Sequence, residues 1–220
     1  MTTTLHYFPS NASFAPHIVL EEIGAPFELA KVDRDRGAHK SPEYLKLNPN
    51  GLIPVLVDDG LVLYEVAAIL MHLADTRGQT AAGERLAPPV GTAQRAEFYK
   101  WLVWLTNTLQ PLIIAYYYPD RWVDAGNASG TVEVKKNAEL RVAPLLDQIE
   151  AQLARHGGPW LLGADYSVAD ALAMMLCRWT RNFARPARSI PHIGAYLGRM
   201  LARPAVQRVI EREALPQPWV

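Results

Sequence analysis

The stretch LHYFPSNASFAPHIVLEEIG, residues 5–24, carries the clearest signal for how the chain folds. A short apolar run comes first, a polar turn with Ser10 and Asn11 follows, and an amphipathic run ends at Gly24. Apolar residues at helical spacing before a glycine predict a strand, a loop and a helix. Ser13 stands where the turn becomes the helix, and a helix start offers unpaired N–H groups that favour negative charge. The sequence thus raises the question of which anion, if any, these polar residues hold.

Short strands and helices continue to alternate after this stretch. PFELAKVD predicts a second strand, and SPEYLKLNPNG predicts a short helix with Ser41 as its N-cap. IPVLVDDGLVLYE reads as a hairpin turning at Asp59-Gly60, a favoured hairpin dipeptide. The next helix, EVAAILMHLADTRG, places its apolar residues on one face. We therefore predict an α/β domain over residues 1–80.

The rest of the chain gives only helical signals. A small, polar, Pro-rich segment over 81–91 predicts a linker, and residues 92–220 form the second domain. One helix should begin at Ser167, which forms a capping box with Asp170, and Pro144 predicts a kink or break in another. The helices are expected at 92–118, 130–155, after Ser167, and around 190–201 and 203–213. The fold class is thus α/β plus all-α.

Charge is balanced over the chain but not within it. The 22 basic and 22 acidic residues of the 220 give zero net charge, which argues against a nucleic-acid partner. Residues 1–80 carry 6 basic and 10 acidic side chains, a net −4, whereas 81–220 carry 16 and 12, a net +4. This difference is either scatter or a sign of two domains that attract each other, within or between chains.

Cysteine usage and hydropathy point to the cytoplasm. The single cysteine, Cys177, excludes an internal disulfide and lies in an apolar helical run, where a buried, inert thiol is expected. The N-terminus lacks signal-peptide features, and no run approaches the roughly 18 apolar residues of a membrane span, so no membrane partner is expected. The six histidines are scattered without ligand spacing, so we expect no metal site.

Several separated motifs resemble one known family. YFPSNASFAPHIVLEEIG, HKSPEYLKLNPNGLIPVL, YEVAAILMHLAD and LLGADYSVADAL resemble, in order and spacing, the glutathione S-transferases, especially the bacterial beta and theta-like classes. The resemblance covers nearly the whole chain. It implies a thioredoxin-like N-terminal domain followed by an all-helical C-terminal domain, in a cytosolic homodimer. It also implies glutathione as co-substrate, a hydrophobic electrophile as second substrate, a role in detoxification, and no metal.

On this resemblance, the anion at the first loop is the glutathione thiolate. Ser13 matches the serine that related enzymes use as thiolate donor, and Tyr7 matches a tyrosine common in the beta class. Ser10 and Asn11 are further donors in the same loop. The alternatives are a structural first-turn hydroxyl for Ser13 and a core aromatic for Tyr7. Ala12 stands where many beta-class members have a cysteine, so chemistry that needs an enzyme thiol here is in doubt.

The resemblance also implies a set of glutathione-binding residues. Ile53 and Pro54 match a dipeptide with a cis proline whose preceding backbone pairs with the cysteinyl part; an ordinary trans turn is the alternative. Glu65 matches the acid that contacts the γ-glutamyl ammonium. Val66 replaces the usual serine, which removes a hydroxyl hydrogen bond worth roughly 1.5–3 kcal/mol. His39 and Lys40 match a loop that holds the glycyl carboxylate, or form an exposed basic loop.

The second substrate is expected against the long helix that follows the linker. The candidates are Phe8, Phe14, Trp104, Asn107, Gln110 and Tyr117, although an aromatic residue at helical spacing more often belongs to the core. The segment YYYPDRWVD is a lid, a dimer surface or a packing element. A basic stripe, Arg178, Arg181, Arg185 and Arg188, forms a solvated face or binds an anionic ligand or acidic partner.

Three functions are compatible with these residues. A glutathione transferase stabilises the thiolate for attack on an electrophilic small molecule. A glutathione-dependent disulfide or peroxide reductase uses the same site with Ser10 and Asn11 as donors. A non-catalytic binding or interaction protein is favoured by Ala12 and Val66.

Overall fold

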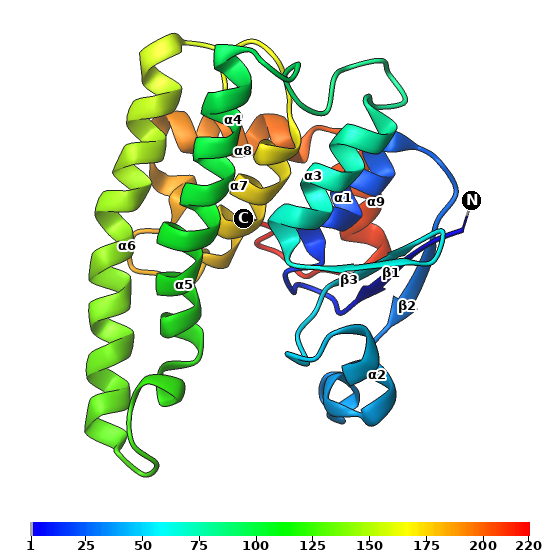
Figure 1. Cartoon of the computed structure of the whole chain (residues 1–220). Coiled ribbons are helices and arrows are strands. Elements are labelled where there is room, and N and C mark those ends of the chain that lie inside the picture. Colours follow the sequence, from blue (N-terminus) through cyan, green and yellow to red (C-terminus); the bar gives the residue numbers. More distant parts are fainter. Residues whose placement is uncertain (1) are drawn as a thin grey trace.

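The computed structural model describes residues 2–220, and its strands all lie in the N-terminal part of this range (Figure 1). They form one sheet in the order β2-β1-β3-β4. The elements of this part are β1 (Thr3–Tyr7), α1 (Phe14–Ile23), β2 (Glu28–Lys31), the 3-10 turn η1 (Ala38–Lys40), α2 (Pro42–Leu47), β3 (Val55–Asp58), β4 (Leu61–Tyr64) and α3 (Val66–Arg77). This arrangement is thioredoxin-like and confirms the predicted α/β domain.

The sheet is built around β1. This strand pairs in parallel with β2 and antiparallel with β3, so Leu5 lies between Leu29 and Leu56. Leu5 and Leu56 are fully buried, because α1 and α3 pack on the sheet and on each other. The predicted hairpin is confirmed as β3–β4, and its turn residues Asp59 and Gly60 both have the positive φ that a tight hairpin turn requires.

The remaining helices form the second domain. They are α4 (Ala93–Trp104), the π turn η2 (Leu105–Leu109), α5 (Gln110–Tyr117), η3 (Pro119–Trp122), α6 (Ala128–His156), α7 (Val168–Trp179), η4 (Ala187–Ser189), α8 (Pro191–Leu201) and α9 (Pro204–Arg212). Every residue of α7 is buried, so α7 is the centre of this domain. In this domain α4, α5 and α8 pack against α7, and α6 packs against α5 and α8, which confirms the predicted all-helical fold class of this part (Figure 1).

The long helix expected at 92–118 is continuous but contains a π turn. Gln110 N–H donates to the carbonyl of Leu105, five residues back, instead of four. Pro111 has no N–H and cannot continue the regular ladder, so the helix widens by one residue just before it. The turn divides the helix into α4 and α5.

The predicted break at Pro144 is wrong, because α6 continues without interruption over Ala128–His156. Pro144 and Leu140, whose carbonyl loses its partner four residues on, are both exposed. Water can satisfy that carbonyl on the outer side of the helix, so the proline is accommodated there.

The start of α7 is held by the predicted capping box. The Asp170 carboxylate accepts hydrogen bonds from Ser167 N–H at 2.9 Å and from Leu161 N–H at 2.8 Å. Complete burial raises the pKa of Asp170 to about 6. Cys177 is buried further along α7, and burial raises the pKa of its thiol to about 12, which is consistent with an inert thiol.

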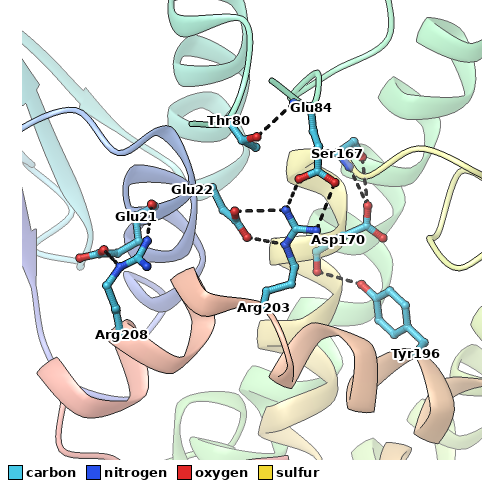
Figure 2. A network of polar contacts seen from close by, with 9 residues as sticks. All are labelled: Glu21, Glu22, Thr80, Glu84, Ser167, Asp170, Tyr196, Arg203 and Arg208. Carbon is cyan, nitrogen blue, oxygen red and sulfur yellow. Dashed lines mark hydrogen bonds and ion pairs between the residues drawn. The ribbon is translucent and has the colours of Figure 1, made fainter. Parts of the chain in front are cut away.

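Ion pairs join α9 to the N-terminal domain (Figure 2). The Arg203 guanidinium lies between Glu22 on α1 and Glu84 in the linker. Arg208 and Arg212 both pair with Glu21. The predicted attraction between oppositely charged domains therefore acts within the chain.

Candidate functional site

The loop between β1 and α1 turns its two serines in different directions. Ser13 is fully buried: its Oγ donates to the carbonyl of Phe8 at 3.1 Å, and Phe8 N–H donates to the same Oγ at 3.3 Å. These bonds close the loop on itself. The Ser13 hydroxyl proton is thus used inside the loop, and Ser13 does not line the cavity described below.

Ser10 has the opposite arrangement. Its φ of 62° is uncommon for a residue other than glycine, and its N–H donates to the carboxylate of Glu213 at 2.9 Å. Its Oγ accepts a hydrogen bond from Nη1 of Arg178 at 3.1 Å. A guanidinium can only donate, so the Ser10 proton remains free for another acceptor. Ser10 lines the cavity, where that acceptor would lie.

Two buried charged residues from the helical domain support this loop. Arg178 on α7 is 1% exposed, and burial together with repulsion from Arg181 lowers its pKa to about 10, so it stays charged at neutral pH. Glu213, just after α9, accepts from Ser10 and is 2.8 Å from Nδ1 of His17. The side chains of His17 and Glu213 are fully buried. The loop therefore takes its shape from both domains.

Asn11 and Tyr7 flank Ser10. Asn11 lines the cavity, and its Oδ1 accepts from Ala12 N–H at 2.7 Å, which leaves its NH₂ group as a donor. Tyr7 does not line the cavity. Its ring packs edge-on against His17, and burial together with the Glu213 carboxylate raises the pKa of its hydroxyl. Of the four expected donors, only Ser10 and Asn11 reach the cavity.

The cavity has a volume of about 320 Å³ and lies between the two domains. The N-terminal domain contributes residues from three loops: Ser10, Asn11, Ala12, Arg34, His39, Lys40, Gly51, Leu52 and Ile53. The helical domain contributes residues at and after the ends of α5 and α7: Gln110, Ile114, Tyr117, Tyr118, Arg121, Trp179 and Arg181.

The loops expected to hold glutathione meet at one side of the cavity. Lys40 Nζ donates to the carbonyl of Asn50 at 3.0 Å. Glycine is favoured at position 51, because its φ is 58° and a Cβ would lie 2.8 Å from the backbone carbonyl oxygen of His39. The Ile53–Pro54 peptide bond is cis. His39, Lys40 and Ile53 line the cavity, whereas Pro54 is buried outside the lining.

Glu65 and Val66 lie at the start of α3, outside the cavity lining. Glu65 is exposed and has a positive φ of 71°, a conformation costing roughly 1–3 kcal/mol that is concentrated at functional sites. Val66 is 6% exposed and belongs to the hydrophobic core. At the position where the family resemblance leads us to expect a serine hydroxyl, the side chain is therefore an apolar one that packs in the core.

Two of the six second-substrate candidates line the cavity, and four do not. Gln110 and Tyr117 line the cavity. Phe14 is buried below the site, with its ring 5.6 Å from the guanidinium carbon of Arg178. The remaining three, which pack in the core or face solvent away from the lining, are Phe8, Trp104 and Asn107.

The basic stripe predicted on one helix is divided. The α7 helix ends at Trp179, so Arg181, Arg185 and Arg188 lie beyond it. Arg178 and Arg181 face the site, whereas Arg185 pairs with Asp147 on the surface. The predicted continuous stripe is wrong because the helix stops.

Sequence reasoning missed part of the cavity wall. No sequence pattern marked Arg34 as a site residue, because it lies in a polar loop after β2. Tyr118 and Arg121 belong to the aromatic segment whose role was left open, and they form the wall with Trp179. The density of aromatic and basic residues in that segment was the available signal.

Comparison with known proteins identifies the family. Family models described as the N-terminal and C-terminal domains of glutathione S-transferase match residues 1–75 and 108–213. The chain is 33% identical over 218 residues to Glutathione S-transferase GST-4.5 of Xanthomonas campestris pv. campestris, which covers 96% of this chain and 98% of the relative. The chain belongs to the glutathione S-transferase family. The two domains and the cavity between them are therefore those of a glutathione S-transferase fold.

Two further comparisons bear on activity within the glutathione S-transferase family. The structure of a sphingomonad glutathione S-transferase complexed with glutathione is 30% identical, with a TM-score of 0.79, and covers 98% of this chain and 100% of that one. The Escherichia coli (strain K12) disulfide-bond oxidoreductase YfcG is 28% identical over 220 residues, or 96% of this chain and 95% of the relative. Two relatives with similar sequence identity to this chain are thus named for different reactions.

Residues 2–220 contain neither a membrane-spanning helix nor a cluster of metal ligands. None of the helices in this range is both long and apolar enough to span a bilayer. The same residues contain no group of three or more His, Cys, Asp or Glu side chains placed to hold a metal ion.

Proposed function

We propose that this protein is a glutathione transferase in which Ser10, with Asn11, stabilises the glutathione thiolate for attack on an electrophilic small molecule. The observation that carries the proposal is the hydrogen bond from buried Arg178 to Ser10, which leaves the Ser10 proton free at the cavity surface. This geometry supports Ser10 in the role first expected of Ser13.

The chemistry requires a charged sulfur. A free thiol has a pKa near 8.5 and is mostly protonated at neutral pH. Donation from Ser10, which Arg178 orients, and from Asn11 favours the thiolate. The thiolate then forms a carbon–sulfur bond to the electrophile as a leaving group such as chloride departs, and the thiol proton goes to solvent. Positioning of both reactants adds to the rate.

Glutathione would bind along the N-terminal domain. The backbone of Ile53 before the cis Pro54 would pair with the cysteinyl part, in the manner of an added strand. Glu65 would contact the γ-glutamyl ammonium, and the Val66 N–H at the start of α3 would bind the γ-glutamyl carboxylate. The glycyl carboxylate would lie at His39 and Lys40. Gln110 and Tyr117 would contact the second substrate across the cavity.

We further propose a cytoplasmic homodimer with a role in detoxification. Exposed apolar side chains on β4 and α4 support an interface between copies: Leu61, Val62, Tyr99 and Val103 are between 38% and 57% exposed. Reduced glutathione is kept available in the cytosol, which supports that location for the reaction.

Calorimetric titration with reduced glutathione at neutral pH is the first test. Sub-millimolar binding would support the proposal, and a turnover assay with a chloronitroarene would follow. The absence of binding at millimolar concentration would favour a non-catalytic member of the family.

Disulfide or peroxide reduction is the second candidate. Ala12 supplies no thiol in the loop, so glutathione itself would be the reductant, held as a thiolate by Ser10 and Asn11. The thiolate would attack one sulfur of the disulfide and release the other as a thiol, and a second glutathione would then release the second thiol and leave as glutathione disulfide. The similarity to an oxidoreductase supports this reading. Parallel assays with a small disulfide and a chloronitroarene separate the two reactions.

A further inference from the structure

We propose that the second substrate carries a carboxylate or similar compact anion beside an aromatic ring, and that Arg121 and Arg181 bind this anion. The inference rests on the proposed function, since it names the class of compound that shares the cavity with glutathione. It differs from the purely hydrophobic electrophile expected from the sequence.

The cavity wall carries positive charge without compensation. Four lining residues are cationic, namely Arg34, Lys40, Arg121 and Arg181, and within residues 2–220 no aspartate or glutamate belongs to the lining. In that same range none of these four side chains forms an ion pair with a carboxylate, whereas Arg77, Arg95, Arg185 and Arg203 each do. A recess lined by charge of one sign concentrates ligands of the opposite sign.

Glutathione alone does not require all four cations. The tripeptide has two carboxylates and one ammonium group. One carboxylate is assigned to His39 and Lys40, and the other to the start of α3, outside the cavity wall. Arg121 and Arg181 belong to the helical domain, on the side where the second substrate is expected. Their charge is therefore available to that substrate.

Contacts with Tyr118 hold two of the guanidinium groups at the cavity. The guanidinium carbon of Arg121 lies 4.1 Å from the centre of the Tyr118 ring, and that of Arg34 lies 5.2 Å from it. Arg34 also donates to the Tyr118 hydroxyl. On the other side, Arg181 donates to the carbonyl of Arg178 at 3.2 Å. These cations are thus positioned by the protein rather than free in solvent.

The combined field affects a neighbouring titratable group. Burial lowers the pKa of His39, and the charges of Lys40, Arg34 and Arg121 lower it further. His39 is therefore neutral at physiological pH. An incoming anion would therefore meet the charges of the arginine and lysine side chains, and His39 would add none.

The wall beside the cations is formed by one aliphatic and two aromatic side chains. Ile114, Tyr117 and Trp179 line this part of the cavity, and Tyr117 donates its hydroxyl proton to the carbonyl of Trp179 at 2.5 Å. The hydroxyl of Tyr117 is therefore committed to the fold, and its ring remains as a packing surface. An aromatic acid matches this pairing of ring faces and guanidinium groups.

Binding of two unreactive probes tests the inference without catalysis. The probes are 3,5-dinitrobenzoate and 3,5-dinitrobenzamide, which differ in charge but hardly in shape. Each is titrated calorimetrically into the full chain, alone and with S-methylglutathione. We expect the acid to bind about tenfold more tightly than the amide, and Arg121→Gln with Arg181→Gln to remove that preference. Lys136→Gln, which removes an exposed charge on α6, is the matched control and should keep it.

Turnover gives an independent readout. Glutathione displaces chloride from 4-chloro-3,5-dinitrobenzoate and from its amide: a carbon–sulfur bond forms, the carbon–chlorine bond breaks, and the thiol proton goes to buffer. Each kcat/KM is divided by the uncatalysed rate constant to remove differences in reactivity. The acid should be preferred by about tenfold in the native chain, and not in the double arginine variant.

A second glutathionyl group is another source of a carboxylate. Titration with glutathione disulfide and S-methylglutathione distinguishes it from an organic acid. If the double variant weakens binding of the disulfide alone, the anion is the second glutathionyl group; if it weakens dinitrobenzoate alone, the anion belongs to an aromatic acid.

Equal binding of acid and amide, including no detectable binding of either, would overturn the inference. So would an acid preference that survives in the double variant. These results are independent of the proposed function, which fails if glutathione itself does not bind. If the acid is preferred in an arginine-dependent way but glutathione does not bind, the proposed anion site is supported and the proposed transferase function is contradicted.

Discussion

The Nη1 atom of Arg178 lies 3.1 Å from the Oγ atom of Ser10, although 168 residues separate them in the chain. Because a guanidinium cannot accept a hydrogen bond, this contact fixes Ser10 as the acceptor and turns its proton elsewhere. The hydroxyl proton of Ser13, in contrast, is already donated to the backbone carbonyl of Phe8. The two serines of one loop are thus chemically different.

Replacing Ser10 by alanine should raise the pKa of bound glutathione by about one unit and lower kcat about tenfold at neutral pH. The loss should shrink as the pH approaches about 9, where the thiol ionises without help. A pH–rate profile with a chloronitroarene measures both effects. A profile that is lower by the same factor at every pH would contradict a role in thiol ionisation.

Replacing Ser13 by alanine should instead affect stability. The variant loses both hydrogen bonds between the Ser13 hydroxyl and Phe8. The Phe8 carbonyl keeps its bond from Asn11 N–H, but Phe8 N–H loses the Ser13 acceptor, at a cost of about 1–2 kcal/mol. Urea unfolding measures the cost, and kcat should change by less than about twofold. A large loss of kcat with unchanged stability would return the thiolate-donor role to Ser13.

Arg178 should act on turnover through Ser10. In Arg178→Met the Ser10 hydroxyl loses its orienting donor, and kcat should fall about fivefold. The double variant Arg178→Met with Ser10→Ala should then be no slower than Ser10→Ala alone. Fully additive losses in this double-mutant cycle would mean that the two residues act separately.

Val66→Ser should tighten glutathione binding about tenfold, because it restores a hydroxyl donor to the γ-glutamyl carboxylate at the start of α3. The same change removes a buried apolar side chain, so the melting temperature should fall. Val66→Ala is the matched control: it should lose stability without gaining affinity. Calorimetry of both variants measures the difference, and equal affinities would contradict the expectation.

Stability should depend on the ionisation of Glu21. Burial alone would raise its pKa, but hydrogen bonds from Arg208 and Arg212 lower the pKa below its usual 4.5. Glu21 therefore binds a proton more readily in the unfolded chain than in the folded one. The ion pairs of Glu21 stabilise the fold fully above about pH 4.5, and this stabilisation is lost as the pH falls through the pKa that Glu21 has in the folded protein. Glu21→Gln should therefore be less stable than the native chain at neutral pH, with a difference that narrows below about pH 4.

Urea midpoints between about pH 3 and pH 7 measure this dependence. Glu133→Gln, which changes an exposed carboxylate on α6, serves as the control. A constant difference between native chain and Glu21→Gln over the whole range would rule out the ion pairs as its source.

Arg203→Met should be the most destabilising surface-charge change between the domains. It leaves Glu22, whose side chain is 9% exposed, without its cation, at a cost of about 3 kcal/mol. Adding Glu22→Gln should recover part of the loss. Arg199→Met, which removes only a bond to the carbonyl of Pro159, should cost much less in the same urea titrations.

Much of the fold could be predicted because its signals are local. The hairpin at Asp59-Gly60, the N-cap at Ser41 and the capping box at Ser167 each depend on a few neighbouring residues, and all three are found. Pro144 was misread because its effect depends on which side of the helix meets water. That side is decided by the packing of α6 on other helices.

The site was less accessible to prediction. The loops whose order along the chain is characteristic of the family could be recognised, and four of their predicted residues line the cavity: Ser10, Asn11, His39 and Lys40. The direction of the Ser13 hydroxyl depends on a rotamer, which no spacing reveals. The charged wall around Arg121 forms only when the two domains pack together, and the basic and aromatic residues of the segment 116–124 were the local signal for it.

The π turn at Leu105–Leu109 holds one residue more than a regular α turn. The turn absorbs this extra residue, so α5 can bury Ile113 while Gln110 and Tyr117 line the cavity. Removing one residue from the turn would restore a regular α-helix and leave α5 facing as it does. The helix can therefore change its length at this place without changing what the far wall of the cavity recognises.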